Sequence, residues 1–128
     1  MVSVIELAAA SVALNLSVTS TPAGGLKDIT WHGTKLNSPG WDDAQSRVLG
    51  FTLAGFGTEP DIHVMMNMYW DALEMDVPTV AGRRWMRAVD TSLPSPTDIA
   101  DPGKEVAFTG QSYRVNARSI VVLVNRPQ

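Results

Sequence analysis

DIHVMMNMYWDALEMDVPTVAGRRWMRAVD, residues 61–90, is the stretch of this 128-residue chain that decides its fold. Apolar and polar residues alternate with period 2 at its start and its end, which is typical of β-strands. The pattern predicts a strand over 62–69, a short strand over 72–77, a loop containing glycine, and a third strand over 85–90. Both faces of the first strand are largely apolar, which predicts a central strand covered on both sides. The stretch therefore indicates the wall of an antiparallel β domain.

Short apolar runs separated by Gly/Pro turns fill the rest of the chain from residue 26 onwards. The proline-rich segment 92–104 is expected to be a surface excursion, with a single helical turn over 95–98. The fold class that we predict is all-β, an antiparallel β-sandwich of about six to eight strands. The remaining predicted strands are 29–31, 48–53, 106–109, 113–115 and 119–125.

Composition changes near a Thr-Pro-Ala-Gly-Gly breaker at 21–25, because the first 25 residues contain no aromatic side chain. We therefore divide the chain into an N-terminal segment, 1–25, and a β-sandwich domain, 26–128. Alternation over 12–18 favours one added strand in the first part, and disorder of this segment is the alternative. The alanine-rich stretch 4–11 is equally compatible with a short helical turn.

The apolar N-terminus does not have the pattern of a signal peptide or a membrane span. It lacks an early Lys or Arg and carries Glu6 in their place. Asn15 and Ser17 interrupt it before the roughly 20 residues that a span needs. The sequence predicts a soluble protein with no membrane partner.

Charge and cysteine content exclude several classes of protein. Thirteen acids against ten bases give a net charge of −3, so we expect no nucleic-acid partner. The cluster Arg83, Arg84 and Arg87 is interpreted as a solvated or internally paired strand edge. With no cysteine, disulfides, thiolate metal sites and a cysteine nucleophile are excluded, and a cytoplasmic location is favoured.

No group of residues assembles a catalytic, metal or cofactor site. His32 and His63 have no second ligand at metal spacing, and packing or hydrogen-bonding roles in the sheet are expected for them. The scattered carboxylates are interpreted as solvated turn acids rather than a glycosidase pair. No nucleophile elbow, phosphate-binding loop or dinucleotide fingerprint is present. The prediction is no catalytic residue, no metal and no cofactor.

The aromatic side chains carry the remaining functional signal. Trp31 and Trp85 are expected in the core, since a buried indole adds a large apolar area to a small domain. Trp41, Tyr69 and Trp70 lie beside turns. For these three we expect either packing or an interface, with stacking on sugar rings as the alternative.

From about residue 24 to residue 124 the chain resembles the C-terminal domain of bacterial glycogen debranching enzymes, the isoamylase-type members of the α-amylase superfamily of glycoside hydrolases. The resemblance covers about four fifths of the chain. It is carried by the segments LKDITWHG (26–33), DIHVMMNMYW (61–70), GRRW (82–85), VDT (89–91), LPSP (93–96) and RSIVVL (118–123).

The resemblance implies a closing β-sandwich that follows a catalytic (β/α)₈ barrel. In such enzymes the barrel supplies the catalytic carboxylates for hydrolysis of α-1,6 branch linkages, and none of its motifs has a counterpart here. At 128 residues the chain is too short for that barrel, which needs about 200 or more. Residues 1–25 depart from the family pattern, and a truncated or split reading frame is the expected origin.

The leading hypothesis is thus a non-catalytic domain that packs against a barrel partner and stabilises it, inactive alone. Met65, Tyr69 and Trp70 are the residues expected at that interdomain contact. An apolar face left uncovered predicts self-association. The alternative is a free-standing carbohydrate-binding module for α-glucans, with Trp41, Tyr69 or Trp70 as its sugar platform.

Overall fold

The computed structural model describes residues 27–128. The predictions for segment 1–25 lie outside the described residues. Eight strands form the described part, which confirms the all-β fold class. Their bounds are β1 (Ile29–His32), β2 (Val48–Leu53), β3 (Ile62–Asn67), β4 (Leu73–Asp76), β5 (Arg83–Asp90), β6 (Val106–Phe108), β7 (Ser112–Val115) and β8 (Ser119–Pro127).

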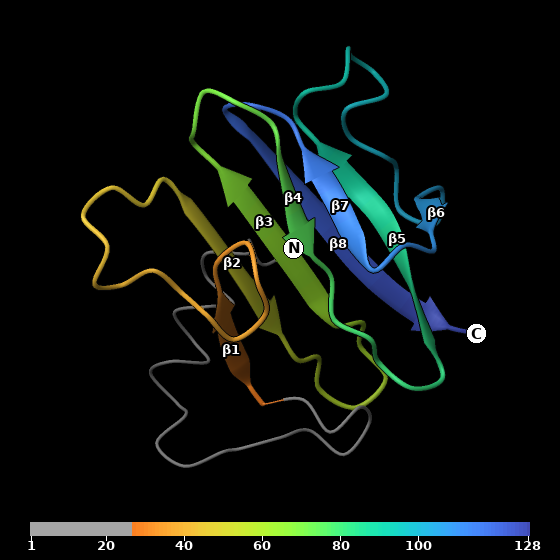
Figure 1. The fold of residues 1–128 in the computed structure, drawn as a ribbon. Coiled ribbons are helices and arrows are strands. Elements are labelled where there is room, and N and C mark those ends of the chain that lie inside the picture. Colours follow the sequence, from red (N-terminus) through yellow and green to blue (C-terminus); the bar gives the residue numbers. More distant parts are fainter. Residues whose placement is uncertain (1–26) are drawn as a thin grey trace.

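Two antiparallel sheets make up the fold (Figure 1). The larger has the strand order β1-β2-β3-β8-β5-β6, and the smaller consists of β4 and β7. The stretch 61–90 supplies β3, β4 and β5, so its three predicted strands are confirmed. They are not neighbours, however, because β8 lies between β3 and β5 and β4 belongs to the smaller sheet.

The predicted helical turn at 95–98 is wrong, since the segment consists of turns and no helix occurs within residues 27–128. Thr97 N–H donates to Pro94 O at 2.9 Å, which closes a turn without continuing it. Pro94 and Pro96 each lack the N–H that a helix would require beyond its first turn. No helix long and apolar enough to cross a membrane occurs in the described part of the chain.

The smaller sheet covers one face of the larger one, which we call the inner face. Buried apolar side chains from both sheets form the core between them, among them Met65, Met75, Val115, Val121 and Leu123. This face also buries polar side chains. They include His32, Thr52, His63, Asn67, Ser119 and Asn125.

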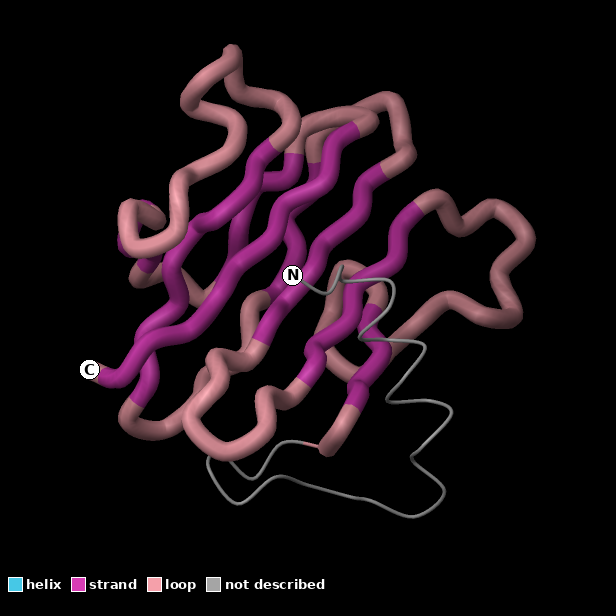
Figure 2. The backbone as a smooth tube through the Cα atoms, turned by 180° about the vertical axis from the view of Figure 1, so that it is seen from behind, coloured by secondary structure: helices cyan, strands magenta, loops and turns pink. Residues whose placement is uncertain are grey.

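The opposite face of the six-stranded sheet, which we call the outer sheet face, is apolar along β1, β2, β3 and most of β8 and β5, and the paired residues Arg84 and Arg126 lie at its end. Figure 2, turned by 180° from Figure 1, looks onto the outer sheet face, and none of the described strands lies across it. The expectation that β3 is central in its sheet is confirmed. Among the described strands, β4 and β7 cover its inner face, and none covers its outer face. The apolar part of the outer sheet face consists of Ile29, Trp31, Leu49, Phe51, Leu53, Ile62, Val64, Met66, Met86, Val89, Ile120, Val122 and Val124.

Candidate functional site

The outer sheet face is a continuous apolar surface that the described strands present. Phe51, Leu53 and Val64 at its centre are buried by their neighbours on adjacent strands. The side chains around them, such as Met66 and Ile120, stay partly exposed. The charged residues of the face, Arg84 and Arg126, are confined to its end, and a contiguous apolar patch marks an interaction surface.

Exposed aromatic and aliphatic side chains extend this face at two edges. Trp41 is 62% exposed and meets Trp31 edge to face, with ring centroids 5.5 Å apart. Trp31 in turn packs on Phe51 at 5.6 Å. At the other edge, Ile99 bridges to Val89 and is also 62% exposed. Trp41 therefore belongs to the rim of the outer sheet face.

Tyr69 and Trp70 form a separate aromatic pair, stacked with centroids 4.1 Å apart and ring planes 27° from parallel. Strand β3 was predicted to run to residue 69, but it ends at Asn67. The cause is the Asn67 side chain, whose Oδ1 accepts the N–H of Tyr69 at 2.9 Å and turns the chain. In an extended strand, adjacent side chains point to opposite faces and cannot stack. Among the described residues, no ring contact joins this pair to Trp41.

The prediction that Met65 lies at an interdomain contact is wrong, because its side chain is 0% exposed on the inner face. Strand alternation explains the error. Met65 points toward β4 and β7 and packs in the core between the two sheets, whereas its neighbours Val64 and Met66 point to the outer sheet face.

The two histidines are linked through Thr52 in a buried hydrogen-bond chain. The N–H of Asn37 donates to His32 Nδ1, so neutral His32 carries its proton on Nε2 and donates to Thr52 Oγ1 at 2.8 Å. The Thr52 hydroxyl then donates to His63 Nδ1, also at 2.8 Å. This confirms the expected hydrogen-bonding role of His63 in the sheet.

The surroundings of both histidines favour their neutral form. Burial lowers the pKa of His32. Burial, with a smaller effect of His32, lowers the pKa of His63 to about 3. Nε2 of His63 has no partner within hydrogen-bonding distance. The backbone of Asp76 has the opposite effect to burial and raises the pKa of His63, but burial outweighs it. A base of this strength, sealed at 0% exposure, has no access to a substrate.

The carboxylates do not form a facing pair in the described part of the chain. Asp42, Asp43 and Glu74 are exposed, and Asp76 lies 3.7 Å from Lys35. Within residues 27–128, no group of three or more His, Asp or Glu side chains is placed to hold a metal ion.

One buried carboxylate that sequence reasoning missed joins the two sheets. Asp90 Oδ2 accepts the Tyr113 hydroxyl at 2.6 Å, and Oδ1 accepts the N–H and hydroxyl of Ser92. Burial opposes the charged form of Asp90, yet the bonds from Ser92 and Tyr113 outweigh it and lower the carboxyl pKa. The period-2 pattern places Asp90 at the end of a strand but gives no sign of a partner 23 residues away.

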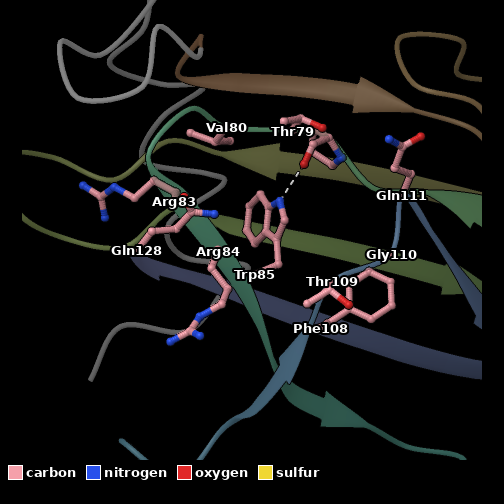
Figure 3. A pocket seen from close by; sticks show the side chains of 11 residues that line it. Thr79, Val80, Arg83, Arg84, Trp85, Phe108, Thr109, Gly110, Gln111 and Gln128 are labelled. Carbon is pink, nitrogen blue, oxygen red and sulfur yellow. Dashed lines mark hydrogen bonds between the residues drawn. The ribbon is translucent and has the colours of Figure 1, made fainter.

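A cavity of about 240 Å³ lies between the loop before β5 and the loop before β7 (Figure 3). The indole of Trp85 lies at its base and donates from Nε1 to Pro78 O at 2.6 Å, and Phe108 faces it. The guanidinium groups of Arg83 and Arg84 point away from the space between the two rings (Figure 3). These cationic groups therefore do not converge on a ligand position.

Comparison with known proteins gives a consistent match. Residues 30–123 match the family model described as isoamylase 1-3, C-terminal. Isoamylase 3, chloroplastic, of Oryza sativa subsp. japonica is 33% identical over 101 residues, which cover 78% of this chain and 12% of that protein. Isoamylase 2, chloroplastic, of the same plant is 30% identical over 112 residues, covering 79% of this chain and 14% of that protein.

A third relative, isoamylase 1, chloroplastic, of Arabidopsis thaliana, is 36% identical over 76 residues, or 59% of this chain and 10% of that protein. The chain thus spans a small fraction of the length of each curated relative that it matches.

Proposed function

The chain belongs to the family of isoamylase C-terminal domains, and on that premise we propose that it serves as the non-catalytic closing domain of an enzyme that hydrolyses α-1,6-glucosidic branch linkages. In this proposal it packs against a catalytic barrel and stabilises it. The family match confirms the resemblance that the sequence segments indicated. The predicted cytoplasmic location remains a proposal, and the plant relatives carry names that place those proteins in the chloroplast.

The outer sheet face is the observation that carries the docking proposal. Its centre is apolar, Arg84 and Arg126 lie at one end, and its rim holds Trp41 and Ile99 in exposed positions. Aromatic residues and Met are enriched at the centre of protein–protein interfaces, and Lys, Asp and Glu are depleted there. The face has that composition.

A catalytic domain is the occupant that the comparisons favour. The chain corresponds to only 12% of rice isoamylase 3, so its counterpart there is attached to a far larger remainder. Burying an apolar face at such a junction yields about 25 cal/mol for each Å² of apolar surface removed from water. A domain docked in this way stabilises the barrel by mass action, because it binds the folded barrel and not the unfolded one.

A chimera tests the proposal directly. Residues 26–128 of this chain would replace the C-terminal domain of rice isoamylase 3, and soluble yield, apparent Tm and hydrolysis of branch linkages would be measured. We expect a soluble, active chimera. The double substitution Met66→Lys/Met86→Lys should lower its yield and Tm, because two ammonium groups would lie in the interface.

The matched control adds the same two charges outside the outer sheet face, at the exposed loop residues Thr109 and Gln111. The variant Thr109→Lys/Gln111→Lys should behave like the unsubstituted chimera. If the Met66/Met86 lysines left yield, Tm and activity unchanged, the outer sheet face would not be the docking surface.

A further inference from the structure

Trp70 is the only tryptophan whose ring has no link to a hydrophobic cluster of the described fold. Trp85 lies in the core, Trp31 packs on the outer sheet face, and Trp41 leans on Trp31. Trp70 is 65% exposed, and its one ring contact among the described residues is with Tyr69. Tyr69 covers one face of the indole, and most of the surface of Trp70 remains exposed. Packing within the described residues therefore does not explain this indole.

Hydrogen bonds of Asn67, which is 0% exposed, fix the backbone of the Tyr69–Trp70 pair. Its Oδ1 accepts the Tyr69 N–H, and its Nδ2 donates to the carbonyls of Asp71 at 2.9 Å and Val115 at 3.1 Å. The Arg118 N–H donates to Tyr69 O at 3.2 Å. The turn that carries both rings is thus tied to the buried end of the sheet. A platform fixed in advance loses little conformational freedom when a ligand binds.

Polar side chains flank the aromatic pair. Asp71 follows Trp70 directly, and Arg118 is brought beside Tyr69 by its backbone hydrogen bond. Both are exposed, and neither makes an ion pair with a residue of the range 27–128. Arg118 has a φ of 52°, in the left-handed region, within the turn between β7 and β8. A carboxylate and a guanidinium close to a flat ring in the chain and across the turn provide hydrogen-bonding groups near an apolar surface.

We propose that Trp70, backed by Tyr69, is the stacking platform of an α-glucan binding site. The apolar C–H face of a glucose unit would lie on the free face of the indole, and its hydroxyls would bond to Asp71 and Arg118. The two rings are stacked one beneath the other rather than set in a row. A single platform suits a curved α-glucan, which presents one or two units at a time, better than a flat β-glucan. The choice of an α-glucan rests on the proposed function, but the platform itself does not.

Affinity electrophoresis of the full 128-residue chain tests the site. Native gels would contain glycogen, a soluble β-glucan or no polysaccharide. We expect glycogen alone to retard the chain. Trp70→Ala should weaken glycogen binding at least about tenfold, as loss of an aromatic hot spot does, and Trp70→Phe should restore part of it. The control is Trp41→Ala, because Trp41 is almost as exposed, at 62%, and should leave retardation unchanged.

Three results would overturn the proposal: no retardation of the unsubstituted chain by glycogen, equal retardation by the β-glucan, or unchanged retardation of Trp70→Ala. Circular dichroism of each variant confirms that the fold is intact. Failure of this site and failure of the docking proposal are separable. Met66→Lys/Met86→Lys changes the outer sheet face and should retain full glycogen binding, whereas Trp70→Ala should retain docking in the chimera.

Discussion

The two faces of the six-stranded sheet have residue compositions opposite to those that their burial in the described fold would predict. The inner face lies under β4 and β7, yet it carries buried polar side chains such as His63, Asn67 and Asn125. The outer sheet face has no described strand over it and is apolar except at its end, where Arg84 and Arg126 pair. A face that meets water in its final state would ordinarily alternate toward polar residues.

This difference separates internal structure from interaction surface. On the inner face, each buried polar side chain makes at least one hydrogen bond that positions a strand or a turn. Asn125 Nδ2 donates to Asp61 at 2.6 Å, and its Oδ1 accepts the Asp61 N–H at 2.9 Å, which joins β8 to the start of β3. The outer sheet face has no such partners to offer and is suited to burial against another apolar surface.

The largest expected effect comes from a cavity on the inner face. Leu123 is 0% exposed, and Leu123→Ala should reduce the free energy of unfolding by about 2–5 kcal/mol. Val124, the next residue, points to the outer sheet face and is only partly buried. Urea denaturation should show a cost below about 1 kcal/mol for Val124→Ala, since fewer contacts are lost there. Equal costs for the two variants would contradict the assignment of the faces.

Acidification should weaken the inner face through His63. Its folded-state pKa of about 3 lies below the unfolded value of 6.5, so the unfolded chain binds one more proton between these pH values. The contribution of neutral His63 is complete above pH 6.5 and is lost as the pH falls. Below about pH 6 the slope approaches roughly 1.4 kcal/mol per pH unit.

Urea denaturation at pH 7 and pH 5 measures that loss, and His63→Gln is the control. The variant removes the titrating group and should flatten the pH dependence relative to the unsubstituted chain. Parallel curves for the two proteins would mean that His63 is not held neutral by the fold.

Loss of the Tyr113–Asp90 hydrogen bond between the two sheets should reduce the free energy of unfolding by a smaller amount. Tyr113 donates to the buried, charged Asp90 at 2.6 Å. Tyr113→Phe removes this bond while keeping the ring, and should cost about 1.5–3 kcal/mol, the range for hydrogen bonds to charged groups. The pKa of Asp90 should rise in the variant, which NMR titration of the carboxyl group can measure. An unchanged Asp90 pKa would show that Tyr113 does not stabilise the charged carboxylate.

The smallest effect on stability is expected on the outer sheet face. Met66 and Met86 are unbranched and partly exposed. Lysine at these positions keeps an aliphatic stem along the sheet and extends its ammonium to water. Met66→Lys/Met86→Lys should therefore change the free energy of unfolding by less than about 1 kcal/mol, as measured by urea denaturation. A loss of several kcal/mol would show that the described fold itself depends on burying this face.

Much of the fold follows from the sequence because strand periods and turn residues are local signals. The run 48–53 has the same bounds as β2, and 119–125 lies within β8. The pairing of β4 with β7 depends on contacts 36 or more residues apart, such as Asp76 with Ser112, and no local pattern encodes them.

The candidate surfaces follow from the sequence less completely. Tyr69 and Trp70 are conspicuous as adjacent aromatics, but their stacking depends on the turn that Asn67 makes at the end of β3. A strand continued to residue 69 would have kept them apart. The apolar alternation of Ile120, Val122 and Val124 is visible in the sequence. Which face of the sheet these residues occupy, and that β4 and β7 cover the other, requires the structure.

Sedimentation velocity of the full chain over a range of concentrations tests the outer sheet face most directly. An apolar interaction surface without its partner should make the unsubstituted chain associate as concentration rises. Met66→Lys/Met86→Lys should remain monomeric, and Thr109→Lys/Gln111→Lys should associate like the unsubstituted chain. A monomer at every concentration for the unsubstituted chain, or association undiminished by the Met66/Met86 lysines, would contradict the account.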